Sequence, residues 1–158
     1  MNPSKVCTPD QAAGRVASLA RPLVLTNGVF DLLHRGHVDC LAQARSLGAS
    51  LVVAINSDAS ARALGKGPGR PLVPCDDRAA VLAALEAVSL VVVFDEPAPL
   101  ALLQRLRPDV YVKGGDYDMA TLAEAALVRA FGGQAIALPF LPGRSTTALV
   151  RRIRALPR

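Results

Sequence analysis

Five short runs of apolar, mostly β-branched residues alternate along this chain with segments whose apolar residues recur at helical spacing. A run that is apolar throughout is typical of a strand covered on both faces. Alternation of such strands with helices predicts a parallel sheet with right-handed crossovers. We therefore predict an α/β fold, a doubly wound sheet of five parallel strands with helices on both faces. The strands are expected at 23–25, 51–55, 90–94, 110–112 and 135–138, and the helices between them at 37–47, 78–87, 100–106 and 122–131.

A short helix is expected ahead of the first strand. Thr8 suits an N-cap, Pro9 suits the first helical position, and Gln11 stands three residues after the cap. Residues 1–20 are therefore predicted to be an N-terminal helical extension of a single domain that spans 1–158. With 158 residues, of which 51% are hydrophobic and 20% charged, the chain can bury a substantial core.

Composition also narrows the choice of partners. The net charge of +5 suits anionic substrates, but the basic residues form no dense tract and Trp is absent, so nucleic-acid binding is a weak alternative. No apolar run reaches the roughly 18 residues of a membrane span, and 1–7 hold no signal-peptide core, so we expect a cytoplasmic protein without membrane contact. Three cysteines without C-x-x-C spacing favour free thiols over a disulfide framework or a zinc site.

Polar or glycine-rich segments follow each of the five predicted strands, at 27–37, 56–58, 95–96, 113–116 and 143–147. In open parallel sheets, ligands bind beyond the carboxyl ends of the strands. A shared cleft at this edge is therefore expected. Because loops are polar in most proteins, this coincidence supports the fold more than any particular chemistry.

The two histidines of the chain, His34 and His37, lie in one tetrad around Gly36. The tetrad stands between a predicted strand and a predicted helix, where backbone N–H groups favour an anion. Gly36 allows close approach of backbone and ligand, and each imidazole can donate a ring N–H to phosphate. One packed histidine and one solvated histidine would be the structural alternative. The clustering of both in one tetrad favours phosphate chemistry.

Three further segments have both a structural and a functional interpretation. The sequence of residues 143–147 predicts a glycine turn followed by a helix start that a hydroxyl caps. The same hydroxyl and N–H groups can bind phosphate. Lys113 ends a predicted strand beside two glycines, where it is either an ordinary edge lysine or a cation leaning over the cleft. The loop 65–71 is rich in Gly and Pro, and it is either a solvated connector or a mobile loop that brings Lys66 and Arg70 inward.

These motifs resemble, in the same order, those of the nucleotidyltransferases of the H-x-G-H type. The matching stretches are Thr26 to Asp31 with His34 and His37, then Val112 to Tyr117, then Gly143 to Thr147. The resemblance runs from about Pro22 to the C-terminus and implies a Rossmann-like fold. It is greatest to the adenylyltransferases that make ADP-heptose and that occur fused to a sugar kinase. Where glycerol-phosphate cytidylyltransferases carry an arginine, this chain has Phe140 and Leu141, which disfavours that branch and leaves the role of Arg144 open.

The resemblance also implies residue roles. His34, His37 and Lys113 are expected to be catalytic. Expected nucleotide- or phosphate-binding residues are Thr26, Asn27, Gly28, Phe30, Gly36, Lys66, Arg70, Gly143, Ser145, Thr146 and Thr147. Expected substrate-binding or orienting residues are Asp31, Asn56, Arg78, Gly114 and Asp116. Magnesium is the expected cofactor, bound through phosphate oxygens; Asp31 is the one candidate protein ligand, but it can equally orient a histidine or cap the turn.

The implied reaction is transfer of AMP from ATP to D-glycero-β-D-manno-heptose 1-phosphate, giving ADP-heptose for the lipopolysaccharide core and releasing pyrophosphate. A substrate phosphate oxygen attacks directly, so rate comes from positioning and charge neutralisation. A separate heptose kinase is expected to supply the sugar phosphate. An adenylyl- or cytidylyltransferase for another phosphorylated alcohol, such as glycerol 3-phosphate, is the alternative, and a non-catalytic nucleotide-binding module is a second. Relatives commonly dimerise, so a homodimer is open.

Overall fold

The computed structural model describes residues 5–157 and contains one parallel sheet with the strand order β1-β4-β3-β2-β5-β6. The strands are β1 (Val6–Cys7), β2 (Leu23–Gly28), β3 (Ser50–Asn56), β4 (Leu90–Phe94), β5 (Val110–Gly114) and β6 (Gln134–Leu138). The predicted parallel α/β sheet is confirmed, but it has six strands rather than five. The additional strand, β1, pairs Val6 with Val91 and Cys7 with Val92, inside the segment predicted to be only a helical extension. Two residues are too few to show a strand pattern.

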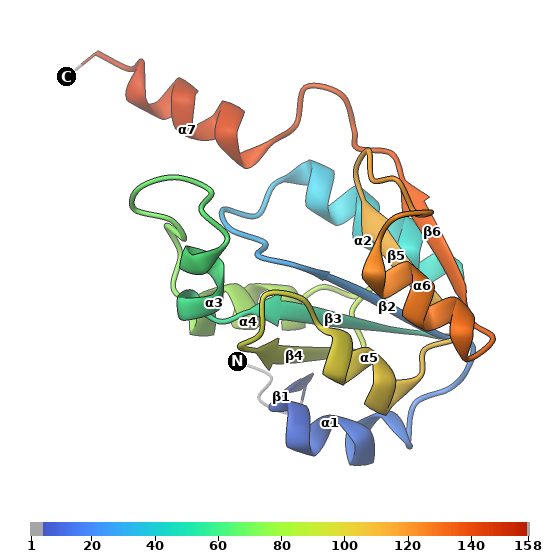
Figure 1. Ribbon diagram of the computed structural model, residues 1–158. Helices are drawn as coiled ribbons and strands as arrows, with labels where there is room; N and C mark the ends of the chain where they lie inside the picture. Colours follow the sequence, from blue (N-terminus) through green and yellow to red (C-terminus); the bar gives the residue numbers. More distant parts are fainter. Residues whose placement is uncertain (1–4, 158) are drawn as a thin grey trace.

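Helices cover both faces of this sheet (Figure 1). The helices of the described residues are α1 (Pro9–Val16), α2 (Arg35–Ser46), α3 (Asp58–Ala63), α4 (Cys75–Ala83), α5 (Leu100–Leu106), α6 (Ala123–Ala130) and α7 (Thr146–Arg154), of which α7 buries no residue. Buried residues of α1, α5 and α6 belong to one core cluster, and those of α2 and α4 belong to another. The helices therefore lie on the two sides that a doubly wound sheet requires.

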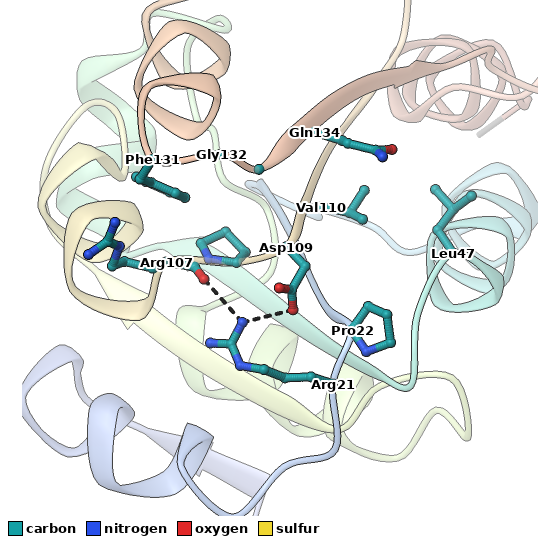
Figure 2. A pocket seen from close by; sticks show the side chains of 11 residues that line it. Arg21, Pro22, Leu47, Arg107, Asp109, Val110, Phe131, Gly132 and Gln134 are labelled. Carbon is teal, nitrogen blue, oxygen red and sulfur yellow. Dashed lines mark hydrogen bonds and ion pairs between the residues drawn. The ribbon is translucent and has the colours of Figure 1, made fainter.

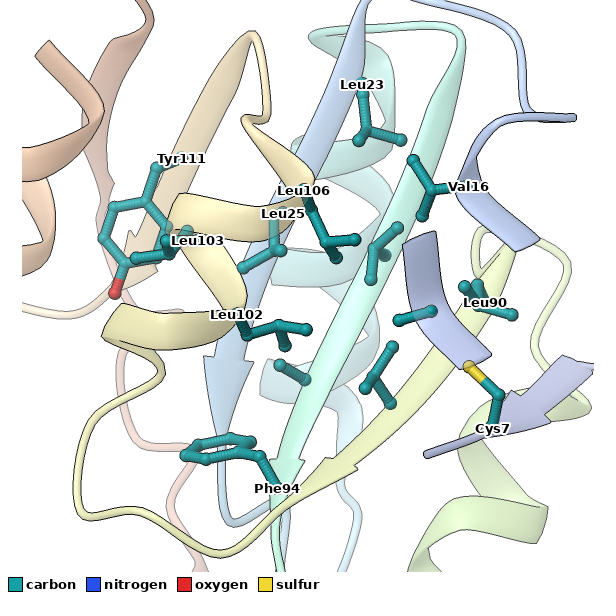
Figure 3. Close-up of a cluster of buried hydrophobic side chains, with 14 of the residues drawn as sticks. Cys7, Val16, Leu23, Leu25, Leu90, Phe94, Leu102, Leu103, Leu106 and Tyr111 are labelled. Atoms are coloured by element: carbon teal, nitrogen blue, oxygen red, sulfur yellow. The ribbon is translucent and has the colours of Figure 1, made fainter. Parts of the chain in front are cut away.

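The strands contribute to the two clusters in alternation, because successive side chains of a strand point to opposite faces. In β2, Leu23 and Leu25 belong to the first cluster and Val24 to the second, and all three are 0% exposed. Figure 3 shows the first cluster, in which leucines of α5 cover β2 and β3, with Tyr111 and Phe94 at its margins. This two-sided burial explains why the strand sequences are apolar without interruption.

Local signals account for most helix starts. Ahead of α1, the backbone N–H of Thr8 donates to Gln11 Oε1 at 3.1 Å, as the predicted cap requires. The helix expected at 78–87 instead occupies Cys75–Ala83, directly after Pro74. α3 was not predicted; it follows β3 within the expected loop, and Ser57 Oγ caps it by accepting from the Ser60 N–H at 3.2 Å.

Residues 5–157 include no helix that is both long enough and apolar enough to cross a membrane.

Candidate functional site

A hollow of about 310 Å³ lies at the carboxyl ends of β2, β3 and β5, and we call it the carboxyl-edge hollow. A smaller hollow of about 150 Å³ shares Val29, Phe30, His37 and Lys66 with it. Sequence-predicted site residues that line one or both are Thr26, Asn27, Gly28, Phe30, Asp31, Gly36, His37, Asn56, Lys66, Arg70, Lys113, Gly114, Thr146 and Thr147. The expected cleft beyond the strand ends is therefore present, and most candidate residues meet there.

A larger hollow lies at the opposite edge of the sheet. It measures about 570 Å³ and is formed by residues that precede β2, β5 and β6, including Arg21, Arg107 and Asp109 (Figure 2). We call it the amino-edge hollow. Its charged groups are already engaged, because Arg21 forms an ion pair with Asp109 at 2.8 Å and Arg107 lies over the Phe131 ring. None of the sequence-predicted site residues lines it.

The first turn of α2 fixes both histidines. His34 is the N-cap of this helix, and its Nδ1 accepts a hydrogen bond from the Gly36 N–H at 3.0 Å. The backbone N–H of His34 donates to His37 Nδ1 at 3.3 Å. Because each Nδ1 accepts a backbone proton, the ring proton of each neutral imidazole resides on Nε2. Both side chains are thus held as N–H donors.

The environment of the two rings keeps them neutral. The imidazoles are stacked, with centroids 3.9 Å apart. Burial, followed by the neighbouring His34 and Lys66, lowers the pKa of His37 to about 4. Burial and then the charge of Arg144 also lower the pKa of His34. Neutral imidazoles can donate to phosphate oxygens near pH 7 without a cost of protonation.

The turn between β2 and α2 contains a glycine that a side chain could not replace and two residues with left-handed backbone. A Cβ on Gly36 would lie 2.9 Å from Cε1 of His34 and 3.1 Å from Cβ of Arg144, so the histidine ring occupies the space a side chain would need. Phe30 and Leu32 have positive φ values of 52° and 51°. Left-handed backbone is uncommon outside glycine and concentrates at functional sites. The unusual backbone of the turn between β2 and α2 therefore supports a functional role for this turn.

Asp31 fastens the glycine-rich loop to this turn. Its carboxylate, 7% exposed, accepts from the N–H groups of Leu72 and Val73 and from Arg70 Nη1, at distances between 2.9 and 3.0 Å. Although burial alone raises the pKa of Asp31, these hydrogen bonds outweigh it and hold the pKa below its usual value. Both carboxylate oxygens accept hydrogen bonds from the protein, so in this structure Asp31 caps the segment that follows the glycine-rich loop.

The loop brings its two cations to different positions. Lys66 lines both hollows, as predicted for a residue that reaches inward. Arg70 also lines the smaller hollow, but its guanidinium is paired with Asp31 at 3.0 Å and its side chain is only 16% exposed. Lys66 is thus the cation of this loop that is placed to meet an anion.

The hydroxyl-rich segment ahead of α7 is joined to the same turn. Thr146 Oγ1 donates to the carbonyl of Asp31 at 2.7 Å, and Thr147 lines the smaller hollow. Ser145 caps α7 by accepting from the Ala148 N–H at 3.1 Å. The turn before it has Gly143 at φ 72°, a conformation that favours glycine. The positive end of α7 therefore lies beside the histidine turn, while the rest of the helix extends away from the sheet (Figure 1).

Lys113 enters the carboxyl-edge hollow from the end of β5. Its Nζ lies 3.4 Å from Asn27 Oδ1 and 5.1 Å from the centre of the Tyr117 ring. The same Asn27 oxygen accepts the hydroxyl of Tyr111 at 2.6 Å, which orients the amide. Burial, and secondarily Lys66, lower the pKa of Lys113, whereas Glu124 acts to raise it. Lys113 is thus a half-buried cation without an ion-pair partner among the described residues.

Two predicted substrate-binding residues have other positions. Arg78 is 2% exposed and lines neither hollow; its guanidinium donates to Val29 O at 2.7 Å, to Asn56 O at 2.9 Å and to Asp58 at 2.7 Å. It therefore ties the chain after β2 to the end of β3. Asp116 is exposed and lines neither hollow. Asn56 does line the carboxyl-edge hollow, and its amide donates to Ser60 Oγ at 2.9 Å.

The structure adds residues that sequence reasoning did not select. Glu124, Tyr117, Phe140 and Cys40 all line the carboxyl-edge hollow. Phe140 also explains Gly115, where a Cβ would lie 2.6 Å from the Phe140 ring. Nothing in the local sequence marks Glu124, a single acid in an amphipathic helix. As expected from their spacing, the three cysteines are free thiols.

Comparison with known proteins decides the family. A family model described as cytidylyltransferase-like matches residues 25–152. This chain belongs to the cytidylyltransferase-like family. The match begins in β2 and ends in α7, so it includes every loop that forms the site. The two histidines, Lys113 and the segment 143–147 lie within it.

The relatives of this cytidylyltransferase-like chain include a named adenylyltransferase and several bifunctional proteins. It is 62% identical over 143 residues to D-beta-D-heptose 1-phosphate adenylyltransferase of Bordetella bronchiseptica, covering 90% of this chain and 86% of that protein. It is 55% identical over 144 residues to bifunctional protein HldE of Streptomyces coelicolor, covering 91% of this chain but 31% of HldE. The chain thus spans about a third of the bifunctional relatives that it matches.

Solved structures of relatives have the same architecture. The lipopolysaccharide core biosynthesis protein of Thermoplasma volcanium superposes with a TM-score of 0.63 at 27% identity, covering 75% of this chain and 95% of that one. Pantoate-beta-alanine ligase of Francisella tularensis gives a TM-score of 0.61 at 16% identity, covering 90% of this chain and 69% of the ligase. At that low identity, the second likeness is one of fold alone. The Rossmann-like fold expected from the motifs is thereby confirmed.

Proposed function

We propose that this chain transfers AMP from ATP to D-glycero-β-D-manno-heptose 1-phosphate, giving ADP-heptose for the lipopolysaccharide core and pyrophosphate. The single observation that carries the chemistry is the pair of imidazoles whose Nδ1 atoms both accept backbone protons. This arrangement leaves two Nε2–H donors, and His37 lines the hollow that also holds Lys66 and Lys113, whereas His34 stacks on His37 and lines neither hollow. The name of the Bordetella relative, 62% identical, supports the choice of sugar.

In the proposed reaction, an oxygen of the sugar phosphate attacks the α-phosphorus of ATP. The new O–P bond forms as the bond from the α-phosphorus to the bridging oxygen breaks, and pyrophosphate leaves with that electron pair. The attacking phosphate is already anionic, so neither a protein nucleophile nor a strong base is needed. Catalysis then consists of positioning and electrostatic stabilisation by His34, His37 and Lys113.

Residues at the start of α7 and in the glycine-rich loop would hold the polyphosphate. The start of α7 at Thr146 and Thr147 presents backbone N–H groups at a positive helix end, and Lys66 adds a cation. Among residues 5–157 there is no cluster of three His, Cys, Asp or Glu that could hold a metal ion. In this proposal magnesium binds through the phosphate oxygens, where it would neutralise charge on ATP.

A sugar 1-phosphate must be made before this reaction can consume it. We propose that a separate heptose kinase supplies it and that the acceptor reaches the chain as a free metabolite. The donors that line the carboxyl-edge hollow, His37, Lys66 and Lys113, support the binding of phosphate groups there. The partners of the chain are then ATP and a sugar 1-phosphate.

Pyrophosphate release by the purified chain tests this proposal. The assay contains magnesium and pairs ATP, CTP or GTP with heptose 1-phosphate, glycerol 3-phosphate or other sugar 1-phosphates. We expect release with ATP and the heptose phosphate. Release only with CTP and glycerol 3-phosphate would replace the substrates and keep the mechanism. ATP binding without release from any pair would favour the non-catalytic nucleotide-binding module.

A further inference from the structure

Glu124 is an acid in a hollow whose other charged groups are cations. It lies in the first turn of α6, is 6% exposed, and lines the carboxyl-edge hollow together with Lys66 and Lys113. α6 covers the opposite face of the sheet from α2 (Figure 1). Glu124 therefore reaches the hollow from the side away from the histidine turn.

The carboxylate of Glu124 has no ion-pair or hydrogen-bond partner among the described residues of the site. Within residues 5–157 it takes part in no ion pair, and the side-chain hydrogen bonds of the site do not include it. No completely enclosed side-chain oxygen or nitrogen in this part of the chain lacks a partner, so the Glu124 oxygens keep some exposed surface, and Glu124 lines the hollow. A buried carboxylate is costly unless donors satisfy it.

Helix stability does not explain this placement. An acid in a first turn interacts favourably with the helix dipole, but it does so equally well at the surface. Asp10 and Asp58 in the first turns of α1 and α3 keep much more exposed side chains, at 93% and 34%. Burial of Glu124 inside a ligand-sized hollow therefore requires a different reason.

The chemistry of the hollow limits what Glu124 can bind. A carboxylate repels phosphate, so it does not hold the reacting groups that His37 and Lys113 attract. It does accept short, charge-assisted hydrogen bonds from neutral hydroxyls, and its two oxygens suit two adjacent hydroxyls. Both substrates of the proposed reaction carry such a pair, one on the sugar ring and one on the ribose of ATP.

We propose that Glu124 accepts hydrogen bonds from a vicinal diol of a substrate held in the carboxyl-edge hollow. This inference rests on the proposed function only in the identity of that substrate. Phosphate then lies toward His37 and Lys113, and the hydroxyl-bearing carbons lie toward α6. The hollow thereby distinguishes the two ends of one ligand by charge.

The first test compares ligands that carry a diol with an anion that carries none. Binding of heptose 1-phosphate, ATP and inorganic pyrophosphate is measured by calorimetry on the wild type and on Glu124→Gln. We expect the diol-bearing ligand held by Glu124 to bind about 10-fold more weakly to the variant, the scale of a lost charged hydrogen bond. Pyrophosphate should bind equally well or more tightly, because a repelling charge is gone.

A second test identifies which diol is bound. The loss caused by Glu124→Gln is measured again with 2′-deoxy-ATP and 3′-deoxy-ATP, and with mannose 1-phosphate against its 2-deoxy and 3-deoxy forms. A contact pair is non-additive, so the substitution should cost little once its hydroxyl partner is missing. Non-additivity with the ribose analogues assigns Glu124 to the nucleotide, and non-additivity with the sugar analogues assigns it to the acceptor. Additive losses in both series would overturn the inference.

A role through Lys113 gives a different pattern. If Glu124 only adjusts the charge of Lys113, the substitution changes the binding of pyrophosphate and of both diol-bearing ligands in the same direction. That outcome would also overturn the inference. Glu86→Gln, an equal loss of charge at an exposed position, is the matched control and should alter no affinity. Unfolding temperatures of both variants check that the fold is kept.

Turnover of the wild type is measured alongside binding. Absence of pyrophosphate release from every substrate pair would end the proposed function, while the binding comparison would still decide the role of Glu124. Normal release together with equal affinities in Glu124→Gln would end this inference and leave the function standing.

Discussion

The two edges of the sheet each carry a hollow, and the larger one is the less equipped for chemistry. The amino-edge hollow measures about 570 Å³, but its arginines are engaged with Asp109 and Phe131 (Figure 2). The carboxyl-edge hollow measures about 310 Å³, yet it holds two lysines, a histidine donor and a buried acid. The difference lies in how many charged and donor groups remain available to a ligand.

Chain topology explains why the two edges differ. All six strands are parallel, so every loop that follows a strand emerges at one edge. The post-strand loops can therefore combine their groups, whereas the pre-strand segments mainly close the fold. At the amino edge, Asp109 accepts from the Leu23 N–H at 2.6 Å and thereby ties the start of β2 to β5. The charged groups at this edge serve structure.

Substitution of His37 should have the largest effect on activity and tests most directly whether the carboxyl-edge hollow is the functional one. We expect His37→Ala to lower kcat by at least about 100-fold, the scale of losing one preorganised transition-state donor. The variant also loses the acceptor for the His34 N–H, so a modest loss of stability, about 1 kcal/mol, should accompany it. Single-turnover rates and thermal unfolding measure the two effects separately. Unchanged turnover in the folded variant would remove the histidine turn from the mechanism.

Lys113→Ala should have the next largest effect. We expect kcat to fall about 10- to 100-fold, because a half-buried cation beside the reacting phosphates is lost while Lys66 remains in the same hollow. Steady-state kinetics with ATP and heptose 1-phosphate measure this change. Lys66→Ala gives the comparison, and the double variant should lose more than either alone. Turnover close to the wild-type value would show that Lys113 is an ordinary edge lysine.

The pH dependence of stability tests whether the half-buried His37 is neutral in the folded protein. The folded pKa of His37 is about 4, against 6.5 for an unperturbed histidine. Between these values the unfolded chain binds a proton that the folded chain refuses, so the free energy of unfolding should fall as the pH decreases from 6.5 to 4. The lowered pKa of His34 acts in the same direction.

Urea unfolding of the wild type and His37→Asn at several pH values measures this contribution. The asparagine oxygen can still accept the His34 N–H, so the cap is kept while the titrating group is removed. We expect a smaller loss of stability on acidification in the variant, and no difference in slope above about pH 7. Identical slopes in the two proteins between pH 6.5 and pH 4 would contradict a neutral, half-buried His37.

The features that could be predicted from sequence were those with short-range signals. The histidine tetrad forms the start of α2. Helix geometry over three residues therefore fixes how His34, Gly36 and His37 lie relative to one another. The strands were recognisable because both faces are buried. β1 was missed because two residues carry no periodicity, and α3 because a cap serine beside Asp58 is also a common loop composition.

The features that could not be predicted depend on contacts between distant parts of the chain. Asp31 and Val73 are 42 residues apart, and only the path of the loop between them determines that Asp31 caps it. In the sequence, Arg78 resembles any arginine near a helix start. Only the structure shows that its guanidinium is buried and donates to two backbone carbonyls. The position of Glu124 in the carboxyl-edge hollow could not be predicted for the same reason, because it depends on the fold and not on the neighbouring residues in the sequence.

The smallest expected effect is at the amino edge, where Arg21→Ala tests whether the larger hollow matters at all. The ion pair of Arg21 with Asp109 is about half exposed, at 49% and 42%, so its loss should cost about 1 kcal/mol or less. Turnover should not change, because Asp109 still holds the Leu23 N–H and the carboxyl-edge groups keep their positions. Denaturant unfolding and steady-state kinetics on the same preparation measure both quantities. A fall in kcat without loss of stability would mean that the two edges are coupled through β2, and that the amino-edge hollow takes part in function despite its internally paired charges.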